Sequence, residues 1–355
     1  RIKFIMAYTT IPKSTDYFNT TLYVGNGSSK TITGIPFAPD FVWIKARSAA
    51  ENHVIVDKVR GANNYLMPNT TATNDTNSEF LKSFTSDGYT LGLGDRVNKS
   101  STNLVSWNWK ANGQGSSNTD GSINTTYTSA NTTSGCSIVT YTGNGTSGAT
   151  IGHGLGVAPA VVLVKRLNAT SDWVMYHKGM GAPPKFIVLN TTAAETSSAG
   201  IFYTTAPTSS VFYVGNDGAT NASGGTYVAY CFADVQGFSK FGSYIGNGNA
   251  DGTFTYLGFK PAFLIVKRVD TGNSWYMYTG KTSTSGGNLT DKYLEANEAN
   301  AEATTTGEYG FDFLSNGFKA TGTGGGTNAS GGTYIYMAFA SEPLVSTNGN
   351  AATAR

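Results

Sequence analysis

Charged side chains are scarce in this sequence, because only 13% of its residues are Asp, Glu, Lys or Arg. The 24 basic and 22 acidic residues nearly balance, so no basic stripe indicates nucleic-acid binding. No apolar run approaches the roughly 18 residues that a membrane-spanning helix needs, so we expect no membrane insertion. The first ten residues lack the apolar core of a signal peptide, and Met6 could be the native start, with residues 1–5 either an upstream addition or an artefact of the numbering.

Residues that commonly carry catalysis or bind metals are also few. The three histidines (His53, His153 and His177) do not have the spacing of a metal-binding motif. The sequence contains no nucleophile elbow and no phosphate-binding loop that precedes a helix. We therefore predict no catalytic residue, no metal site and no cofactor.

Glycine, small polar residues and aromatic residues are abundant instead. The chain has 44 glycines and 12% aromatic residues, which is typical of a β-rich protein with many turns. Segments with helical periodicity are rare, and the best of them, 291–302, is brief. The composition predicts an all-β fold.

Several phrases recur along the chain and reveal an internal repeat. The phrase TNASGGTY at 220–227 returns unchanged at 327–334, and a diverged copy begins at Asn98. Three further phrases each occur three times in the same order: YVGNG, YTGNG and YIGNG; FAPDFVWIK, VAPAVVLVK and FKPAFLIVK; YLMPN, FIVLN and YLEAN. Copies of this length are the size of domains rather than of solenoid units.

The repeat predicts three homologous domains in tandem, each an antiparallel β-sandwich of the jelly-roll or lectin-like kind. We expect an elongated body with these bounds: an N-terminal arm at 1–17, repeats at 18–112, 113–234 and 235–341, and a C-terminal tail at 342–355.

Alternation with period two indicates which strand faces are buried. In the strand that closes each repeat, one parity is apolar in all copies, and we expect it to face the core of its own domain: Val105, Trp107, Trp109, Val228, Tyr230, Phe232, Ile335, Met337 and Phe339. The strand between the recurrent Pro and Lys is apolar on both faces, which indicates a strand covered on both sides.

The repeated TNASGG phrase has two interpretations. It is either a turn before the closing strand, with glycines available for positive φ, or a loop that touches a ligand. We favour the turn, because a scaffold recurs between repeats whereas binding loops usually diverge.

Some aromatic residues are candidates for contacts with partners. Trp173, Tyr176, Trp275 and Tyr278 could form a sugar-binding platform if their rings are exposed, although inward packing is the favoured alternative. Tyr227, Tyr334 and Tyr336 lie on the less uniform face of the closing strand and are candidates for an interface between copies of the chain.

The two cysteines, Cys136 and Cys231, both belong to the second repeat. A disulfide between them is geometrically possible, but the other two repeats have no bridge. We therefore favour free thiols.

The segments that begin at Met6 (MAYTTIPKSTDYFNTTLYVGNG), at Gly135 (GCSIVTYTGNGTSGATIGHGLGVAPAVVLVKR) and at Phe339 (FASEPLVSTNGNAATAR) resemble tandem-repeat virion proteins of marine tailed bacteriophages. The resemblance covers nearly the whole chain from Met6. It implies a structural or adhesive component of the virion, such as a tail fibre, a receptor-binding protein or a decoration protein. It implies no catalytic residue.

Three classes of function therefore remain in view. The first is a non-enzymatic virion component that assembles in the host cytoplasm, forms homo-oligomers, contacts other virion proteins and binds host-surface glycans. The second is an array of carbohydrate-binding modules without a virion. The third, and least favoured, is a polysaccharide depolymerase, which would require two facing carboxylates.

Overall fold

The computed structural model describes residues 8–283, 289–305 and 307–343. In these residues the chain is nearly all β, as the composition predicted, and its sheets are antiparallel. The helical elements there are single turns: η1 (Ser14–Asp16), α1 (Asp95–Asn98) and η2 (Lys178–Met180). None of the helices described is long and apolar enough to cross a membrane. The segment with helical periodicity, 291–302, instead forms strand β24 (Lys292–Glu295) and turns.

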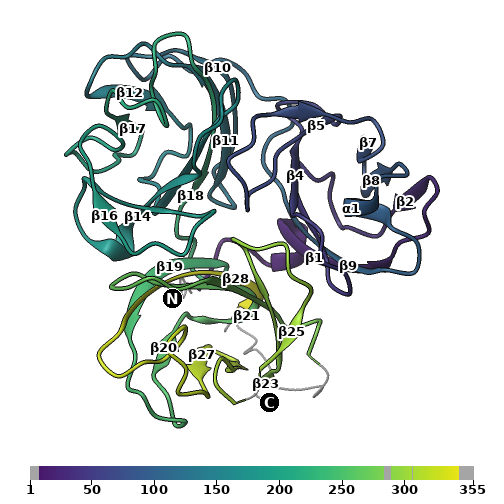
Figure 1. The fold of residues 1–355 in the computed structure, drawn as a ribbon. Helices are drawn as coiled ribbons and strands as arrows, with labels where there is room; N and C mark the ends of the chain where they lie inside the picture. The colour runs from purple at the N-terminus through teal and green to yellow at the C-terminus, as the bar shows by residue number, and fades with distance from the viewer. Residues whose placement is uncertain (1–7, 284–288, 306, 344–355) are drawn as a thin grey trace, which may run out of the picture.

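The strands are grouped in three lobes around a common centre (Figure 1). Lobe 1 contains η1 to β9, lobe 2 contains β10 to β18, and lobe 3 contains β19 to β28. Four strands have the same order in the main sheet of every lobe: β1-β9-β3-β4, β11-β18-β13-β14 and β19-β28-β21-β22. Their bounds are β1 (Phe18–Val24), β9 (Asn103–Trp109), β3 (Phe41–Ala46), β4 (Val54–Asp57), β11 (Cys136–Thr142), β18 (Thr226–Phe232), β13 (Val161–Arg166), β14 (Val174–His177), β19 (Ser239–Ile245), β28 (Thr333–Pro343), β21 (Phe259–Arg268) and β22 (Trp275–Thr279).

Shorter strands complete each lobe. In lobe 2, β10 (Thr125–Asn131) pairs with the outer edge of β11 and so extends the main sheet. The other short strands are β2 (Lys30–Ile32), β5 (Asn64–Tyr65), β6 (Asp75–Thr76), β7 (Leu81–Thr85), β8 (Gly88–Leu91), β12 (Ala149–Gly152), β15 (Lys185–Val188), β16 (Thr196–Ser197), β17 (Val211–Val214), β20 (Phe254–Tyr256), β23 (Leu289–Thr290), β25 (Ala303–Thr304), β26 (Phe311–Leu314) and β27 (Gly317–Ala320).

One apolar core is shared by all three lobes. The rings of Trp109, Phe232 and Phe339 meet there, and their centroids lie 5.5–6.1 Å apart. All nine residues of the predicted apolar parity belong to this shared core. The parity is therefore correct, but the expectation that it faces a separate core in each repeat is wrong. The expected elongated body is wrong for the same reason, because the lobes close around a centre (Figure 1).

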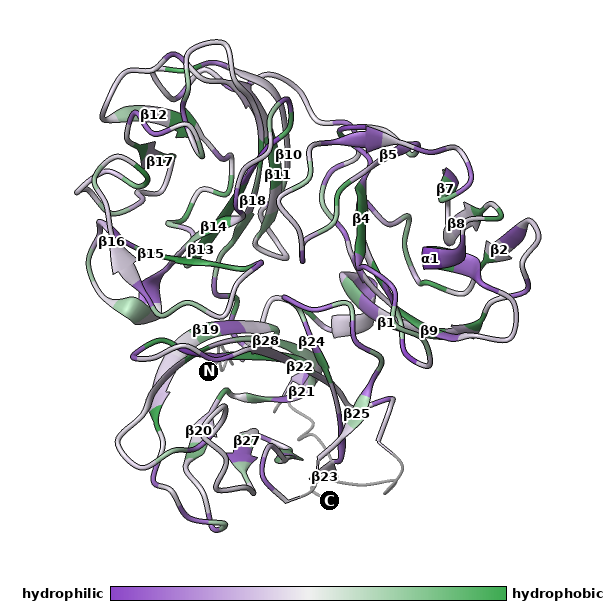
Figure 2. Ribbon diagram, in the orientation of Figure 1, coloured by the Kyte–Doolittle hydropathy of each residue, from purple (hydrophilic) through white to green (hydrophobic). Residues whose placement is uncertain are grey.

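Each lobe also has an apolar core of its own on the other face of its main sheet. Figure 2 shows hydrophobic strands such as β4 and β11 between the centre and the lobe interiors. Strands β3, β13 and β21 place alternate residues in the shared core and in the lobe core. Their apolar character on both faces follows from this double burial.

The repeated TNASGG phrase is a structural turn. Asn221 is fully buried, and its side-chain amide donates to the carbonyls of Thr146 and Gly215 while its oxygen accepts from the backbone N–H of Asn144. Asn328 makes the equivalent bonds in lobe 3. The buried asparagine therefore ties the turn to the GNG loop of its lobe, which explains why both phrases recur together.

Candidate functional site

The three seams between lobes are joined by equivalent hydrogen bonds that form a closed ring. Trp173 Nε1 of lobe 2 donates to the Met67 carbonyl of lobe 1 at 3.2 Å. Trp275 Nε1 of lobe 3 donates to the Val188 carbonyl of lobe 2 at 3.0 Å. His53 takes the same position in lobe 1, and its Nε2 lies 3.1 Å from the Glu295 carbonyl of lobe 3. The carbonyls belong to corresponding residues of the YLMPN, FIVLN and YLEAN phrases.

The recurrent lysines cross the same seams. Lys165 Nζ donates to the Thr71 carbonyl at 2.9 Å, and Lys267 and Lys45 make the equivalent bonds to Thr192 and Ala299 at 3.1 Å. These three lysines are buried, and burial lowers the pKa of each to about 8. Their recurrence in sequence therefore marks contacts between lobes rather than a solvated face.

The predicted sugar platform is not exposed. Trp173 and Trp275 lie in the seams, and Tyr176 and Tyr278 lie in the cores of lobes 2 and 3. All four side chains are buried. A sugar ring stacks on an accessible aromatic face, so burial excludes these residues as a platform, and inward packing is the correct alternative.

The predicted interface tyrosines are buried as well. Tyr227 and Tyr334 close the TNASGG turns, because each hydroxyl accepts from the N–H of the alanine in that turn and donates to a glycine carbonyl. Tyr336 packs against Phe318 in the core of lobe 3. They are scaffold residues and not part of an outer interface.

The three histidines and the two cysteines are all buried. In each histidine Nδ1 accepts an N–H and Nε2 faces a carbonyl, which indicates a neutral ring that carries its proton on Nε2. Burial lowers the pKa of His53 to about 3 and that of His177 to about 4, and it also lowers the pKa of His153.

Cys136 and Cys231 are free thiols, as favoured, and burial raises the pKa of both. Among the residues that the structure describes, no group of three or more His, Cys, Asp or Glu could hold a metal ion.

The seam between lobes 3 and 1 departs from the pattern of the other two. Thr20 on β1 occupies the place of Ile138 and Phe241, which fill the shared core from the equivalent strands β11 and β19. After the fourth strand, lobe 3 has Gly280 and Lys281, where lobe 1 has Lys58 and the buried Val59. The smaller Thr20 and Gly280 and the more polar Lys281 leave this seam incompletely filled.

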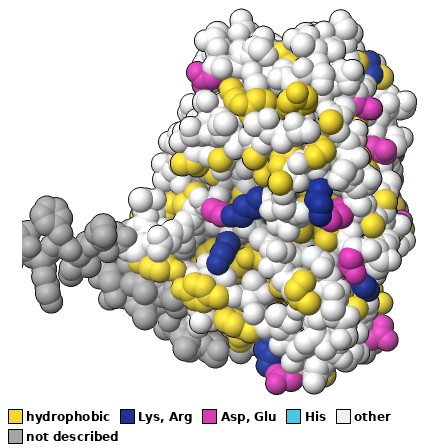
Figure 3. Space-filling model, turned by 90° about the vertical axis from the view of Figure 1, so that its left-hand side faces the viewer, with side chains coloured by type: hydrophobic (Ala, Val, Ile, Leu, Met, Phe, Trp, Pro, Cys, Tyr) yellow, Lys and Arg dark blue, Asp and Glu magenta, His cyan; other side chains and the backbone are white. Residues whose placement is uncertain are grey.

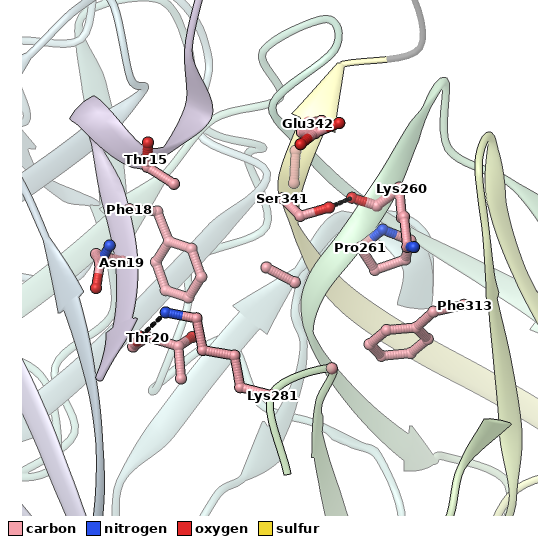
Figure 4. A pocket seen from close by; sticks show the side chains of 13 residues that line it. Thr15, Phe18, Asn19, Thr20, Lys260, Pro261, Lys281, Phe313, Ser341 and Glu342 are labelled. Atoms are coloured by element: carbon pink, nitrogen blue, oxygen red, sulfur yellow. Dashed lines mark hydrogen bonds between the residues drawn. The ribbon is translucent and has the colours of Figure 1, made fainter. Parts of the chain in front are cut away.

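A cavity of about 330 Å³ occupies this seam (Figure 4). Thr15, Phe18, Asn19 and Thr20 line it from lobe 1, and the opposite wall comes from lobe 3: Lys260, Pro261, Ala262, Gly280, Lys281, Phe313, Ala340, Ser341 and Glu342. The side chain of Lys281 extends across the gap, and its Nζ donates to the Thr20 carbonyl. Hydroxyl, carboxylate and ammonium groups therefore line the cavity together with apolar side chains, whereas the side chain of Asn19 points away from it and accepts from Thr21 Oγ1.

Two hydroxyl oxygens next to this cavity are buried and have no hydrogen-bond partner among the described residues. Thr20 is 3% exposed, and its Oγ1 is buried without a partner, as is Oγ1 of Thr15. A buried hydroxyl without a partner costs about 1–3 kcal/mol. Burial also lowers the pKa of Lys281. Sequence reasoning missed this site, although an alignment of the repeats would show Thr20 as the polar exception to Ile138 and Phe241.

A second depression of about 430 Å³ continues from the cavity along β1. The two share Asn19, Thr20 and Lys281, and the second extends to Thr33 and Gly34. Figure 3 shows one face of the molecule, on which scattered charged side chains lie among hydrophobic and uncharged groups. The paired hollows are the best candidate for a ligand site.

The comparisons with known proteins place the chain in a family. No curated protein and no solved structure matches it. A family model described as a domain of unknown function, DUF7483, matches residues 13–343 and therefore spans all three lobes. The chain belongs to the DUF7483 family.

Proposed function

We propose that this protein is a non-enzymatic structural and adhesive component of a virion, such as a phage tail fibre or a surface appendage, that binds host-surface glycans. In this proposal each lobe is a jelly-roll or lectin-like sandwich derived from one ancestral repeat. The resemblance of the sequence to phage virion proteins motivates the location. The observation that carries the adhesive role is the seam cavity, which offers binding groups to a small polar ligand.

The composition of the cavity favours binding over hydrolysis. Glu342 is the one carboxylate among its lining residues, all of which the structure describes. Hydrolysis of a glycosidic bond normally needs a second carboxylate that faces the first. The depolymerase is therefore the weaker alternative.

Self-association is the second part of the proposal. The tyrosines first considered for it are buried, so the contact must use other residues. Ile245, Phe254 and Tyr256 of lobe 3 are each between 44% and 54% exposed and offer apolar area. Several copies on one particle would raise the avidity of a weak site by roughly 10²–10⁴.

The test is to look for the protein in purified virions and to measure its mass in solution and its binding to a glycan array. The proposal predicts a stoichiometric virion protein, a defined oligomer and glycan binding. A strict monomer that is absent from virions but binds glycans would support an array of binding modules instead. Release of reducing ends from a host polysaccharide would support the depolymerase.

A further inference from the structure

A further hollow, of about 520 Å³, lies on lobe 2 and shares no residue with the seam cavity. Its wall comes from the end of β13, from β14 and β15, and from residues 217–219, which directly precede the repeated turn. Phe186 and Val188 line the hollow and are only partly buried. The hollow therefore has an apolar patch that a ligand can reach.

Lobe 3 fills the equivalent place with tyrosine rings. Tyr293 stands at the position of Phe186 in the aligned phrases. Its ring packs against Tyr276 and Tyr309, with ring centroids 5.4 and 5.8 Å away. Lobe 2 has Val174 at the position of Tyr276, and Phe186 contacts no other aromatic ring among the residues that the structure describes. A ring brought by a ligand would restore the packing on Phe186 that lobe 3 provides internally.

A neighbouring small residue differs between the two lobes together with the tyrosine. Gly326 in lobe 3 corresponds to Ala219 in lobe 2, because each directly precedes the repeated phrase. A Cβ at Gly326 would lie 2.3 Å from the ring of Tyr276, so this tyrosine requires a glycine beside it. Lobe 2 lacks both residues of the pair, and Ala219 lines the hollow. The open space is therefore a feature of lobe 2 and not of the repeat.

Arg166 lines the hollow without an ion pair. Its Nε donates to Asn168 Oδ1 and its Nη1 to the Gly218 carbonyl, whereas its Nη2 has no partner among the described residues. In lobe 3 the equivalent Arg268 forms a salt bridge with Asp270, and lobe 2 has Asn168 at the place of this aspartate. The guanidinium of Arg166 is partly exposed and therefore available to a ligand.

Two carboxylates line the same hollow. Oδ1 of Asp172 accepts from the side-chain amide of Asn190. Oδ1 of Asp217 accepts from the backbone N–H of Ala219. The Oδ2 atoms of both carboxylates have no hydrogen-bond partner in the described part of the chain, and neither carboxylate forms a salt bridge with Arg166 there. One cation and two anions give the lining a formal charge of −1, which disfavours an acidic ligand.

We propose that this hollow binds one neutral sugar unit of a glycan, with the C–H face of the sugar against Phe186 and its hydroxyl groups hydrogen-bonded to Arg166 and the two carboxylates. A neutral sugar matches the lining because its hydroxyls both donate and accept, while its C–H groups form an apolar face that packs on an aromatic ring. The volume lies within the range of small-molecule sites. The inference rests on the proposed glycan-binding function and adds a second site, with its own ligand class.

The experiment is calorimetric titration of the full chain with the methyl glycosides of glucose, galactose and mannose, and with methyl glucuronide and glycerol as comparisons. We expect at least one of the three neutral glycosides to bind about tenfold more tightly than methyl glucuronide, because the lining is negative. Glycerol carries hydroxyls but no ring, and it should bind more weakly still. Failure of all three glycosides to bind, or equal binding of glucuronide or glycerol, would overturn the inference.

Two variants locate the binding. Arg166→Met removes the guanidinium and should weaken binding about tenfold, whereas Arg268→Met, the equivalent change in lobe 3, should leave it unchanged. Val174→Tyr combined with Ala219→Gly copies the residue pair of lobe 3 into the hollow and should abolish binding. Circular dichroism melts check that the variants fold. Wild-type affinity in folded Arg166→Met, or in the folded double variant, would contradict the proposed site.

These outcomes separate the inference from the proposed function. If the chain binds a glycan array and the hollow variants bind it equally well, the inference fails and the adhesive function stands at another site. If a neutral glycoside binds in the hollow but the protein is absent from virions, the site stands and the virion role fails.

Discussion

The indole ring of Trp109 lies edge-on to the phenyl ring of Phe339, with ring centroids 5.5 Å apart, although the two residues close the first and the last lobe. Phe232 closes the second lobe and contacts both. The three closing strands therefore end at one point, and no lobe completes its burial without the other two.

Truncation of this cluster should destabilise the whole chain. Phe232→Ala removes a buried ring from the shared core and should lower the free energy of unfolding by about 3–5 kcal/mol in urea titrations. Combined with Phe339→Ala, the loss should be non-additive by about 0.5–3 kcal/mol, because the two rings touch. Phe232→Ala with Phe80→Ala should be additive, because Phe80 lies in the separate core of lobe 1. Additivity in both pairs would contradict the shared core.

The buried asparagine of the repeated turn should be structurally important. Asn221→Ala leaves the carbonyls of Thr146 and Gly215 without their donor, and we expect a loss of about 2–3 kcal/mol in unfolding experiments. Asn300→Ala, at an exposed position, should change stability by less than about 0.5 kcal/mol. Similar small effects for both would favour the ligand-loop interpretation of the phrase.

Histidine burial predicts a loss of stability in acid. The pKa of His177 is about 4 in the folded chain and near 6.5 in the unfolded chain, so the unfolded state binds the proton first as pH falls. Stability from this residue is complete above pH 6.5 and falls by about 3 kcal/mol towards pH 4. Urea titrations between pH 7 and pH 4 should show a smaller decline for His177→Gln than for the wild type. An identical decline would mean that the ring is protonated in the folded state.

Burial of the seam lysines predicts how the stability of the fold changes at alkaline pH. Burial lowers the pKa of Lys165 to about 8, below the value of about 10.4 in an unfolded chain, so deprotonation favours the folded state. Stability should therefore rise between pH 8 and pH 10, before the tyrosines of the unfolded chain ionise. Lys165→Met should show less of this rise, and Lys82→Met should behave as the wild type. A profile that is flat or falling between pH 8 and pH 10 in the wild type would contradict the lysine burial.

The sequence predicted which strand residues are buried, but it did not predict which parts of the chain cover them. Alternation in the closing strand identifies Trp109 and Phe232 as buried, but it carries no information on which side chains cover them. The recurrence of Lys45, Lys165 and Lys267 marks a constraint common to all repeats, yet a contact across a seam and a contact within a lobe produce the same recurrence.

The sequence indicated even less of the candidate site than of the contacts between lobes. Tryptophan is a residue type that often stacks on sugars, and the sequence alone does not distinguish an exposed ring from a covered one. Only the three-dimensional arrangement shows that the neighbouring lobe covers Trp173 and Trp275. Thr20 and Lys281 lie far apart in the sequence and come together because lobe 3 closes against lobe 1. The one sequence signal is that Thr20 is polar where the other repeats have Ile138 and Phe241.

The closed arrangement of the lobes is tested most directly by calorimetry of the full chain together with the fragment 113–234. The shared core predicts one cooperative transition for the full chain, with a calorimetric enthalpy equal to the van't Hoff enthalpy. It also predicts no cooperative transition for the fragment, because Tyr230 and Phe232 would be exposed. A fragment that melts cooperatively at the temperature of the full chain would show that the repeats are independent domains and would contradict the account.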